Sequence, residues 1–253
     1  DFMAIHRDHD TTTTAGNVSP VETKKQKKDM PDKGEIMSID AEFVVLETEK
    51  LKHQKSNLAT TNDNSSVQSS SSSSSLPSSV MRDHVAQPMF SLGRVSVIRD
   101  KTCEIFMDDF IATQSEVVHD YMTRYSGLKE GDLDIETSTH HITHLKATYM
   151  KLRALVDRGV VFVGHGLQND FRTINIYVPR SQVIDTVELF QLPRQRKISL
   201  RFLANFLLRS VIQQETHCSV EDAQTALKVY HTYLEYVEKN SFEQLLNEVY
   251  TVG

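Results

Sequence analysis

The stretch Ile-Met-Ser-Ile-Asp-Ala-Glu-Phe-Val-Val-Leu at residues 36–46 decides the fold of this chain. It predicts a β-strand, because apolar and β-branched residues fill it. Side chains alternate along a strand, so Asp40 and Glu42 share one face, about 6.6 Å apart along the backbone. Two solvated acids on an edge strand would give the same Asp-x-Glu pattern. The run is too apolar for an edge, however, and acids in a central strand need a reason.

A second acidic motif is Gly-His-Gly-Leu-Gln-Asn-Asp-Phe at residues 164–171, directly after the apolar run 160–163. Its two glycines permit a tight strand-to-helix turn, which places Asp170 in the first turns of the next helix. The pattern is also close to a dinucleotide-binding fingerprint, with Asp185 as the distant acid, but the third glycine is absent. We interpret Asp185 and Thr186 instead as a strand end and a helix cap.

A third motif, His-Cys-Ser-Val-Glu-Asp-Ala at residues 217–223, opens a predicted helix over 220–237. Apolar residues recur there at spacings of three and four, and Asp222 lies on the flank of that stripe. Asp222 can be a helix cap together with Ser219, or a metal ligand, or both. His217 is a candidate general base, because a neutral imidazole accepts a proton near neutral pH. A single loop histidine is more often inert.

The four acidic residues can act as one site only if the fold brings them together. Converging carboxylates repel one another, so cations between them are needed to keep them ionised. Two divalent ions held in this way, about 3.5 to 4 Å apart, are a known means of cleaving phosphodiesters. The sequence therefore favours a metal-dependent nuclease with Asp40, Glu42, Asp170 and Asp222 as ligands.

The order of predicted elements indicates an α/β fold with a mixed sheet flanked by helices. Strands are predicted at 36–46, 90–99, 104–107, 160–163 and 182–184. Helices are predicted at 139–156, 168–177, 200–208 and 220–237, with a last one opened by Ser241 and its capping partner Gln244.

Composition bounds the domain organisation. Residues 1–34 are polar and read as a disordered linker, and residues 35–253 as one domain. A serine-rich, low-complexity insertion at about 47–87 interrupts that domain. The net charge of −6 argues against a broad basic face for nucleic acid. Two cysteines imply no disulfide framework, and no apolar run is long enough for a membrane span.

Two further sequence patterns suggest other kinds of site. His140, His141 and His144 could bind a transition metal, but histidines crowded on one helical face of a polar segment are more often exposed to solvent. Cys218 beside His217 suggests a thiol nucleophile, yet adjacent side chains diverge and no orienting partner is evident.

Taken together, the motifs resemble the DEDD superfamily of 3′-to-5′ exonucleases, in its histidine subclass. The stretches at residues 162–176, 182–190, 199–204 and 217–223 are similar to the nuclease domain of catalytic subunits of the poly(A)-nuclease deadenylation complex. Two departures from that family are Cys218, where an Asp is expected, and the serine-rich insertion. Neither touches the five proposed site residues.

The resemblance implies a ribonuclease H-like fold and a cytoplasmic enzyme that removes messenger RNA poly(A) tails and releases 5′-AMP. It also implies two Mg²⁺ ions, with Mn²⁺ as an alternative, and His217 as the base. A pseudokinase subunit and, through it, poly(A)-binding protein are the implied partners. Phe43 and Asn169 are the nearest candidates for substrate contact, although the strand period turns Phe43 away from the acids. The alternative is a catalytically silent domain of the same fold that only binds RNA or partners.

Overall fold

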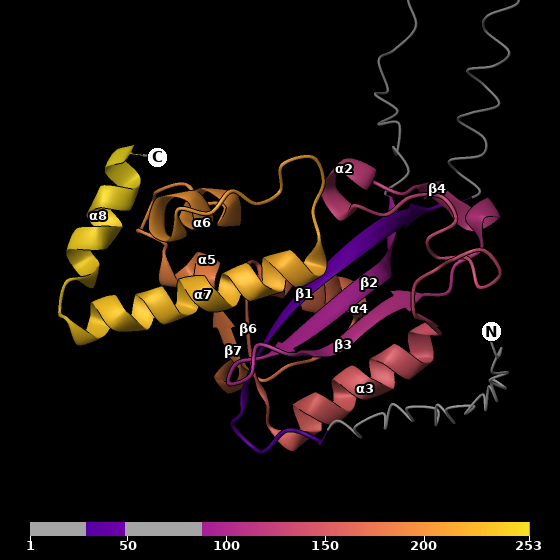
Figure 1. Cartoon of the computed structure of the whole chain (residues 1–253), viewed down its shortest axis with the longest axis horizontal. Helices are drawn as coiled ribbons and strands as arrows, with labels where there is room; N and C mark the ends of the chain where they lie inside the picture. Colours follow the sequence, from indigo (N-terminus) through magenta and orange to yellow (C-terminus); the bar gives the residue numbers. More distant parts are fainter. Residues whose placement is uncertain (1–28, 49–87, 253) are drawn as a thin grey trace, which may run out of the picture. The chain divides into compact units, whose positions relative to one another are not determined.

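The fold is built on a seven-stranded mixed sheet (Figure 1). It is seen in a computed structural model that describes residues 29–48 and 88–252. The strand order is β5-β3-β2-β1-β6-β7, with β4 paired to the end of β1. Strand β1 (Ile36–Leu46) runs antiparallel to β2 (Met89–Arg99) and parallel to β6 (Val161–Gly164). The prediction that the strand with the two acids is central is therefore confirmed.

The remaining strands extend the sheet on both sides. β3 (Ile105–Ile111) pairs with β2, and β5 (Ile142–Thr143) pairs with β3. β7 (Val183–Asp185) lies parallel to β6, and β4 (Val118–Asp120) pairs with the last residues of β1. Two short 3-10 turns, Ser115–Val117 and Arg180–Gln182, precede β4 and β7.

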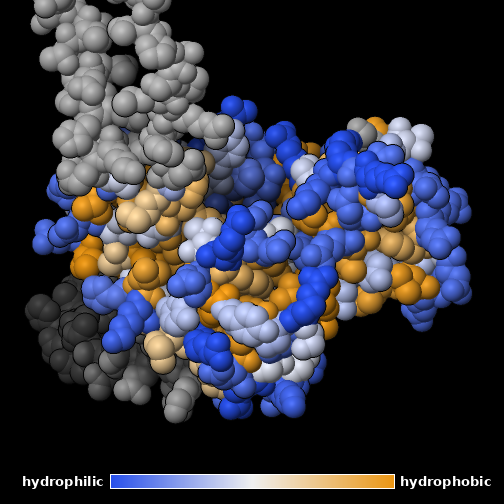
Figure 2. Space-filling view, turned by 180° about the vertical axis from the view of Figure 1, so that it is seen from behind, coloured by the Kyte–Doolittle hydropathy of each residue, from blue (hydrophilic) through white to orange (hydrophobic). Residues whose placement is uncertain are grey.

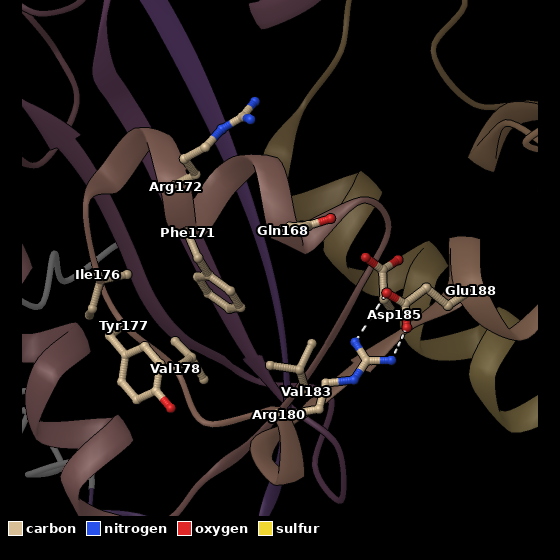
Figure 3. Close-up of a pocket in the computed structure, with 10 residues that line it drawn as sticks. All are labelled: Gln168, Phe171, Arg172, Ile176, Tyr177, Val178, Arg180, Val183, Asp185 and Glu188. Atoms are coloured by element: carbon tan, nitrogen blue, oxygen red, sulfur yellow. Dashed lines mark hydrogen bonds and ion pairs between the residues drawn. The ribbon is translucent and has the colours of Figure 1, made fainter.

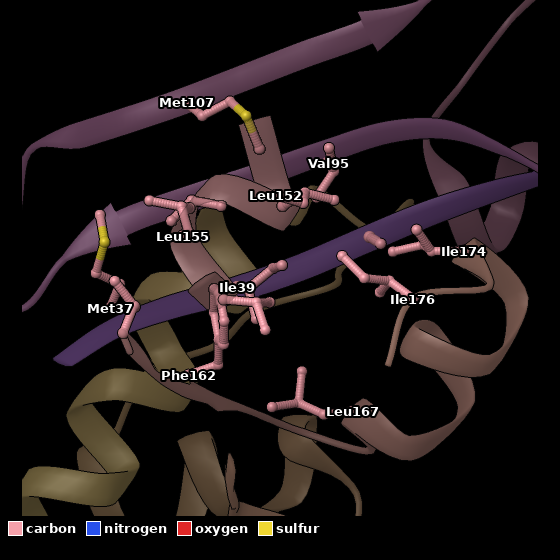
Figure 4. Packing of buried hydrophobic residues seen from close by; sticks show 14 of the residues in the cluster. Met37, Ile39, Val95, Met107, Leu152, Leu155, Phe162, Leu167, Ile174 and Ile176 are labelled. Carbon is pink, nitrogen blue, oxygen red and sulfur yellow. The ribbon is translucent and has the colours of Figure 1, made fainter. Parts of the chain in front are cut away.

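The two faces of the sheet differ in chemistry. On one face, Met37 and Ile39 of β1 join a buried apolar cluster with Leu152 and Leu155 of helix α3 (Leu145–Arg158) (Figure 4). On the other face, Asp40 lies beside Ser96 in the β1–β2 ladder. The alternation expected for β1 is thus confirmed from Met37 to Glu42, and one face is left for polar side chains.

Helix α7 (Ser219–Glu238) lies over that polar face. Its first residue, Ser219, shares a buried 2.6 Å hydrogen bond between hydroxyl oxygens with Ser96. A second apolar cluster unites the C-terminal helices and contains Phe190, Leu203 and Val229. These helices are α5 (Thr186–Leu189), α6 (Leu200–Leu208), α7 and α8 (Phe242–Val252).

One predicted helix start is wrong. Residues 139–144 are not helical, because Ile142 and Thr143 pair with β3 and the ring of His140 stacks on Phe110 at 4.0 Å. His140, His141 and His144 are exposed, as expected, but they do not share a helical face. At α8, the Ser241 hydroxyl donates to the Tyr236 carbonyl and Gln244 donates to Glu248, so the predicted capping box is not formed.

Three short elements were not expected from the sequence, β4, β5 and α2 (Thr123–Ser126), and α5 was anticipated only through its cap at Asp185. Each spans two to four residues, too few for a hydrophobic period to show. Most of the predicted linker and of the serine-rich insertion lies outside the described residues, so the domain boundaries stay a prediction. Within the described helices, none is long and apolar enough to cross a membrane.

Candidate active site

Three carboxylates meet where β1 passes the N-terminus of α7. Asp40, Glu42 and Asp222 each offer an oxygen, and these oxygens lie within 4.8 Å of one another. Glu42 is 5% exposed and Asp222 is 3% exposed. Burying three carboxylates this close together is costly unless a positive charge compensates them.

All seven site residues expected from the sequence line one pocket of about 330 Å³. Asp170 and Asn169 enter from helix α4 (Leu167–Ile174), and His217 from the segment that precedes α7. The other lining residues come from β2, α2 and α4 and from β1 itself: Ala41, Phe90, Met122, Tyr125, Ser126 and Thr173.

The carboxyl groups perturb one another. Burial, then Glu42, Asp170 and Asp222, raise the pKa of Asp40 well above its usual value. Burial and Asp222 raise the pKa of Glu42 to about 9, against a smaller opposing effect of Arg94. Burial and Asp185 raise the pKa of Asp170 to about 7. The protein alone therefore does not hold all these carboxyls ionised at neutral pH.

Two of the carboxylate oxygens lack a hydrogen-bond partner in the described part of the chain. Glu42 Oε1 and Asp222 Oδ1 are buried and unpaired there. Buried polar atoms in native proteins are almost always paired, so a ligand is the expected partner. Carboxylate oxygens are the donors that Mg²⁺ and Mn²⁺ prefer, and the residues present thus fit a divalent cation.

His217 stands beside this group. Its Nδ1 atom lies 3.4 Å from Asp222 Oδ2, and its side chain is 34% exposed. Gln213 Nε2 donates a 2.8 Å hydrogen bond to the same Asp222 oxygen. The ring of Tyr125 meets the imidazole edge to face, with 6.3 Å between the ring centroids. An imidazole at the rim of an acidic pocket can accept a proton from a bound molecule.

A tight turn delivers Asp170 to the pocket. A Cβ at Gly164 would lie 2.8 Å from the Ile39 carbonyl oxygen, and Gly166 has a φ of +89°, so both positions require glycine. Asp185 Oδ1 accepts hydrogen bonds from the amides of Gly166 and Val187. The prediction of Asp185 as a cap is confirmed, and its carboxylate is committed to this turn instead of to a dinucleotide ribose.

Asp222 does not cap helix α7. Residue Cys218 caps α7 without a side-chain hydrogen bond, and Ser219 is bonded to Ser96. The helix-cap interpretation of Ser219 and Asp222 is therefore wrong, and the Asp222 carboxylate faces the pocket. The Cys218 sulfur accepts a 3.4 Å contact from the Arg94 guanidinium, so its nearest polar partner is a cation and not a base.

Phe43 departs from the simple strand period. The β1–β2 register shifts between Glu42 and Phe43, a bulge that loosens strict alternation. The Phe43 ring is partly buried, packs against the apolar cluster and still lines the pocket. Sequence reasoning missed Tyr125 and Gln213, because both lie in short or irregular segments whose contacts to His217 and Asp222 are not local.

A second pocket of about 380 Å³ lies on the other side of α4 (Figure 3). Its acids are committed, since Glu188 pairs with Arg180 and Asp185 caps the turn. Tyr177, which lines this pocket, is 76% exposed. The face of the molecule opposite to that in Figure 1 shows hydrophobic residues at the surface among hydrophilic ones (Figure 2). None of the five acid or histidine residues predicted for the site lines this second pocket.

Comparison with known proteins supports a nuclease. Residues 80–230 match the model of a family described as Exonuclease (RNase_T). The match includes Asp170, His217 and Asp222, and the strand with Asp40 and Glu42 precedes it. One relative is the PAN2-PAN3 deadenylation complex catalytic subunit Pan2 of Mus musculus. It is 45% identical over 232 residues, which are 89% of this chain and 17% of that protein. The chain thus spans about a sixth of the length of the curated relatives it matches.

Two solved structures share the fold. The Neurospora crassa Pan2 catalytic unit (protease and nuclease domain) is 38% identical with a TM-score of 0.68, over 89% of this chain and 31% of that one. The Saccharomyces cerevisiae Pan2 pseudoubiquitin hydrolase-RNA exonuclease module in complex with A7 RNA is 38% identical with a TM-score of 0.70, over 90% and 33%. The ribonuclease H-like mixed sheet implied by the sequence resemblance is confirmed.

Proposed function

This chain belongs to the exonuclease family whose model matches residues 80–230, and from that premise we propose that it is a 3′-to-5′ exoribonuclease that removes poly(A) ends of messenger RNA. The family implies dependence on a divalent metal. The observation that carries the proposal is the group of three carboxylates, Asp40, Glu42 and Asp222, with ligand oxygens within 4.8 Å of one another.

Four acids of this pocket hold the metal in our proposal: the three of the group and Asp170 from α4. The ions are two Mg²⁺, with Mn²⁺ as an alternative. When bound, they would lower the pKa of the attacking water and neutralise negative charge on the phosphate. The unpaired Glu42 Oε1 and Asp222 Oδ1 atoms support this assignment, since a cation satisfies both.

His217 acts as the general base. Asp222 Oδ2 lies 3.4 Å from its Nδ1 atom, so Nε2 is the ring nitrogen left to accept the proton from water. The oxygen of that water forms a bond to the terminal phosphorus, and the bond from this phosphorus to the 3′ oxygen of the preceding nucleotide breaks. A proton returns to the leaving oxygen, and the products are 5′-AMP and an RNA that is one nucleotide shorter.

Preference for adenosine rests on stacking and strand shape, because carboxylates and cations act on phosphate, which every nucleic acid shares. Phe43 and Asn169 line the pocket and remain our candidates for substrate contact. The relative solved with A7 RNA supports an oligo(A) substrate.

We also propose partners and a cellular location for this chain. The relatives are named as catalytic subunits of a PAN2-PAN3 deadenylation complex, and these names support our proposal that this chain acts within such a complex. The pseudokinase subunit, the indirect link to poly(A)-binding protein and the cytoplasmic location follow from the resemblance and stay predictions.

Purified chain and a 5′-labelled RNA with a 3′ oligo(A) tail test the proposal. We expect shortening of the tail in Mg²⁺, none in excess EDTA, and recovery when Mg²⁺ or Mn²⁺ is added back. Full activity in EDTA would contradict the metal-dependent mechanism.

A further inference from the structure

The main chain of His217 lies against Gly127, the residue that ends the short helix α2. A Cβ built on Gly127 would be 2.3 Å from the His217 carbonyl oxygen and 3.5 Å from Thr216 Oγ1. Real Cβ atoms do not approach a backbone oxygen this closely, so any side chain at residue 127 must displace one of the two segments. Gly127 also has a φ of +68°, which favours glycine independently.

The α2 side of this contact is firmly held. The Ser126 hydroxyl donates to the Tyr121 carbonyl at 2.6 Å and accepts from the Leu128 amide at 3.0 Å. The Thr123 hydroxyl donates to the Leu128 carbonyl at 2.6 Å. Leu128 is 2% exposed and packs with Val44, Phe110 and Leu133. The turn is therefore tied both to itself and to the sheet.

The His217 side is held by side chains: Gln213 donates to Asp222, Cys218 contacts Arg94, and Ile212 is buried in the C-terminal apolar cluster. Residues 209–218 form neither helix nor strand, so backbone ladders do not fix them. Asp222 and Tyr125 contact the imidazole from α7 and α2. Because no backbone ladder fixes residues 209–218, we expect them to move more than the α2 turn if the two segments were forced apart.

We propose that Gly127 is a positioning residue for His217: its missing side chain lets the rigid α2 turn seat the His217 main chain, and so sets where the imidazole stands relative to Asp222. This inference rests on the proposed function of His217 as the base. Displacement of a catalytic group by about 1 Å can cost about 10²-fold in rate.

The first test is Gly127→Ala in the whole chain, with Gly34→Ala as the matched control. Gly34 has a φ of +79°, and no atom of the described chain lies within 4 Å of a Cβ built there. Both variants carry the strain of positive φ, and only the first collides with His217. We expect Gly127→Ala to lower kcat about 10- to 100-fold with KM changed less than about twofold, and Gly34→Ala to retain the wild-type kcat. Equal losses in both variants, or none in either, would overturn the inference.

Gly127→Asn separates strain from collision. Asparagine adopts positive φ more readily than alanine, but it still carries the Cβ. The same loss in Gly127→Asn as in Gly127→Ala supports the contact, whereas recovery to wild-type kcat would show that strain alone was responsible.

A double-mutant cycle asks whether Gly127 acts through His217. In a His217→Ala background, Gly127→Ala should lower the residual rate less than about twofold, because the group that it positions is gone. A full 10- to 100-fold further loss would assign Gly127 a general structural role. If Gly127→Ala does not fold, Thr123→Val replaces it in the same cycle, because it removes the hydroxyl bond to the Leu128 carbonyl, lies outside the pocket lining and creates no collision.

A spectroscopic measurement keeps this inference separate from the proposed activity. The imidazole NMR signals of His217 in the metal-free chain should shift in Gly127→Ala and stay in place in Gly34→Ala. Unchanged signals in both would overturn the inference. A wild-type chain with no activity would overturn the proposed function, and the NMR comparison would still decide the role of Gly127.

Discussion

His217 Nδ1 lies 3.4 Å from Asp222 Oδ2. The same carboxylate keeps its other oxygen, Oδ1, buried and unpaired in the described part of the chain. The Asp222 carboxylate thereby contacts the imidazole through Oδ2 and leaves Oδ1 available for a cation. This division links the proposed base to the proposed metal site through a single residue of α7.

Asp40→Asn should abolish cleavage and leave the fold largely intact. Asp40 belongs to the group of three converging carboxylates, and an amide oxygen is a weaker ligand than a carboxylate. RNA decay in Mg²⁺ and far-ultraviolet circular dichroism measure the two outcomes. Glu104→Gln is the matched control, because Glu104 is exposed on the β2–β3 turn. Unchanged turnover in Asp40→Asn would contradict the two-ion site.

His217→Ala should lower the rate about 10²- to 10⁴-fold, the usual contribution of general base catalysis, with little change in metal affinity. Single-turnover kinetics and a Mn²⁺ titration followed by calorimetry measure these two quantities. A collapse of metal affinity together with the rate would make His217 a ligand or a structural residue.

Glu42→Gln should stabilise the metal-free protein at alkaline pH. Folding raises the pKa of Glu42 from 4.5 to about 9, so the folded state binds more protons than the unfolded state between those values. Stability therefore falls as pH rises through that window, and a neutral side chain avoids the loss. We expect Tm at pH 8 in EDTA to rise by about 4 °C or more, and Tm at pH 4 to change little.

Magnesium provides the converse control for that prediction. At pH 8, Mg²⁺ should raise Tm more in the wild type than in Glu42→Gln, because the cation compensates the ionised carboxylate. An equal Tm for both proteins across the whole pH range would show that Glu42 is not strained by its neighbours.

A 3′ oligo(A) tail should decay faster than oligo(C) or oligo(U) tails on the same RNA body. The reason is that stacked adenosines present a distinct strand shape to the aromatic side chains at the pocket, such as Phe43. Parallel time courses with 5′-labelled RNAs measure the rates. Equal rates on all tails would reduce the assignment to a general 3′ exonuclease.

Much of the site was predictable because its acids lie in patterned segments. The apolar run around Asp40 and Glu42 predicted a central strand, and the two glycines before Asp170 predicted the turn that presents it. The contact of Gly127 with His217 was not predictable, since 90 residues of chain separate them and α2 is only four residues long. His140 shows the opposite failure, because a non-local pairing of Ile142 with β3 overrode a local helical pattern.

The most direct measurement compares a linear 5′-labelled oligo(A) with the same RNA closed into a circle, each incubated with the chain in Mg²⁺. We predict a ladder of single-nucleotide steps and release of 5′-AMP from the linear RNA, and an intact circle, because the pocket acts on a free 3′ end. Cleavage of the circle, or internal fragments from the linear RNA, would contradict this prediction.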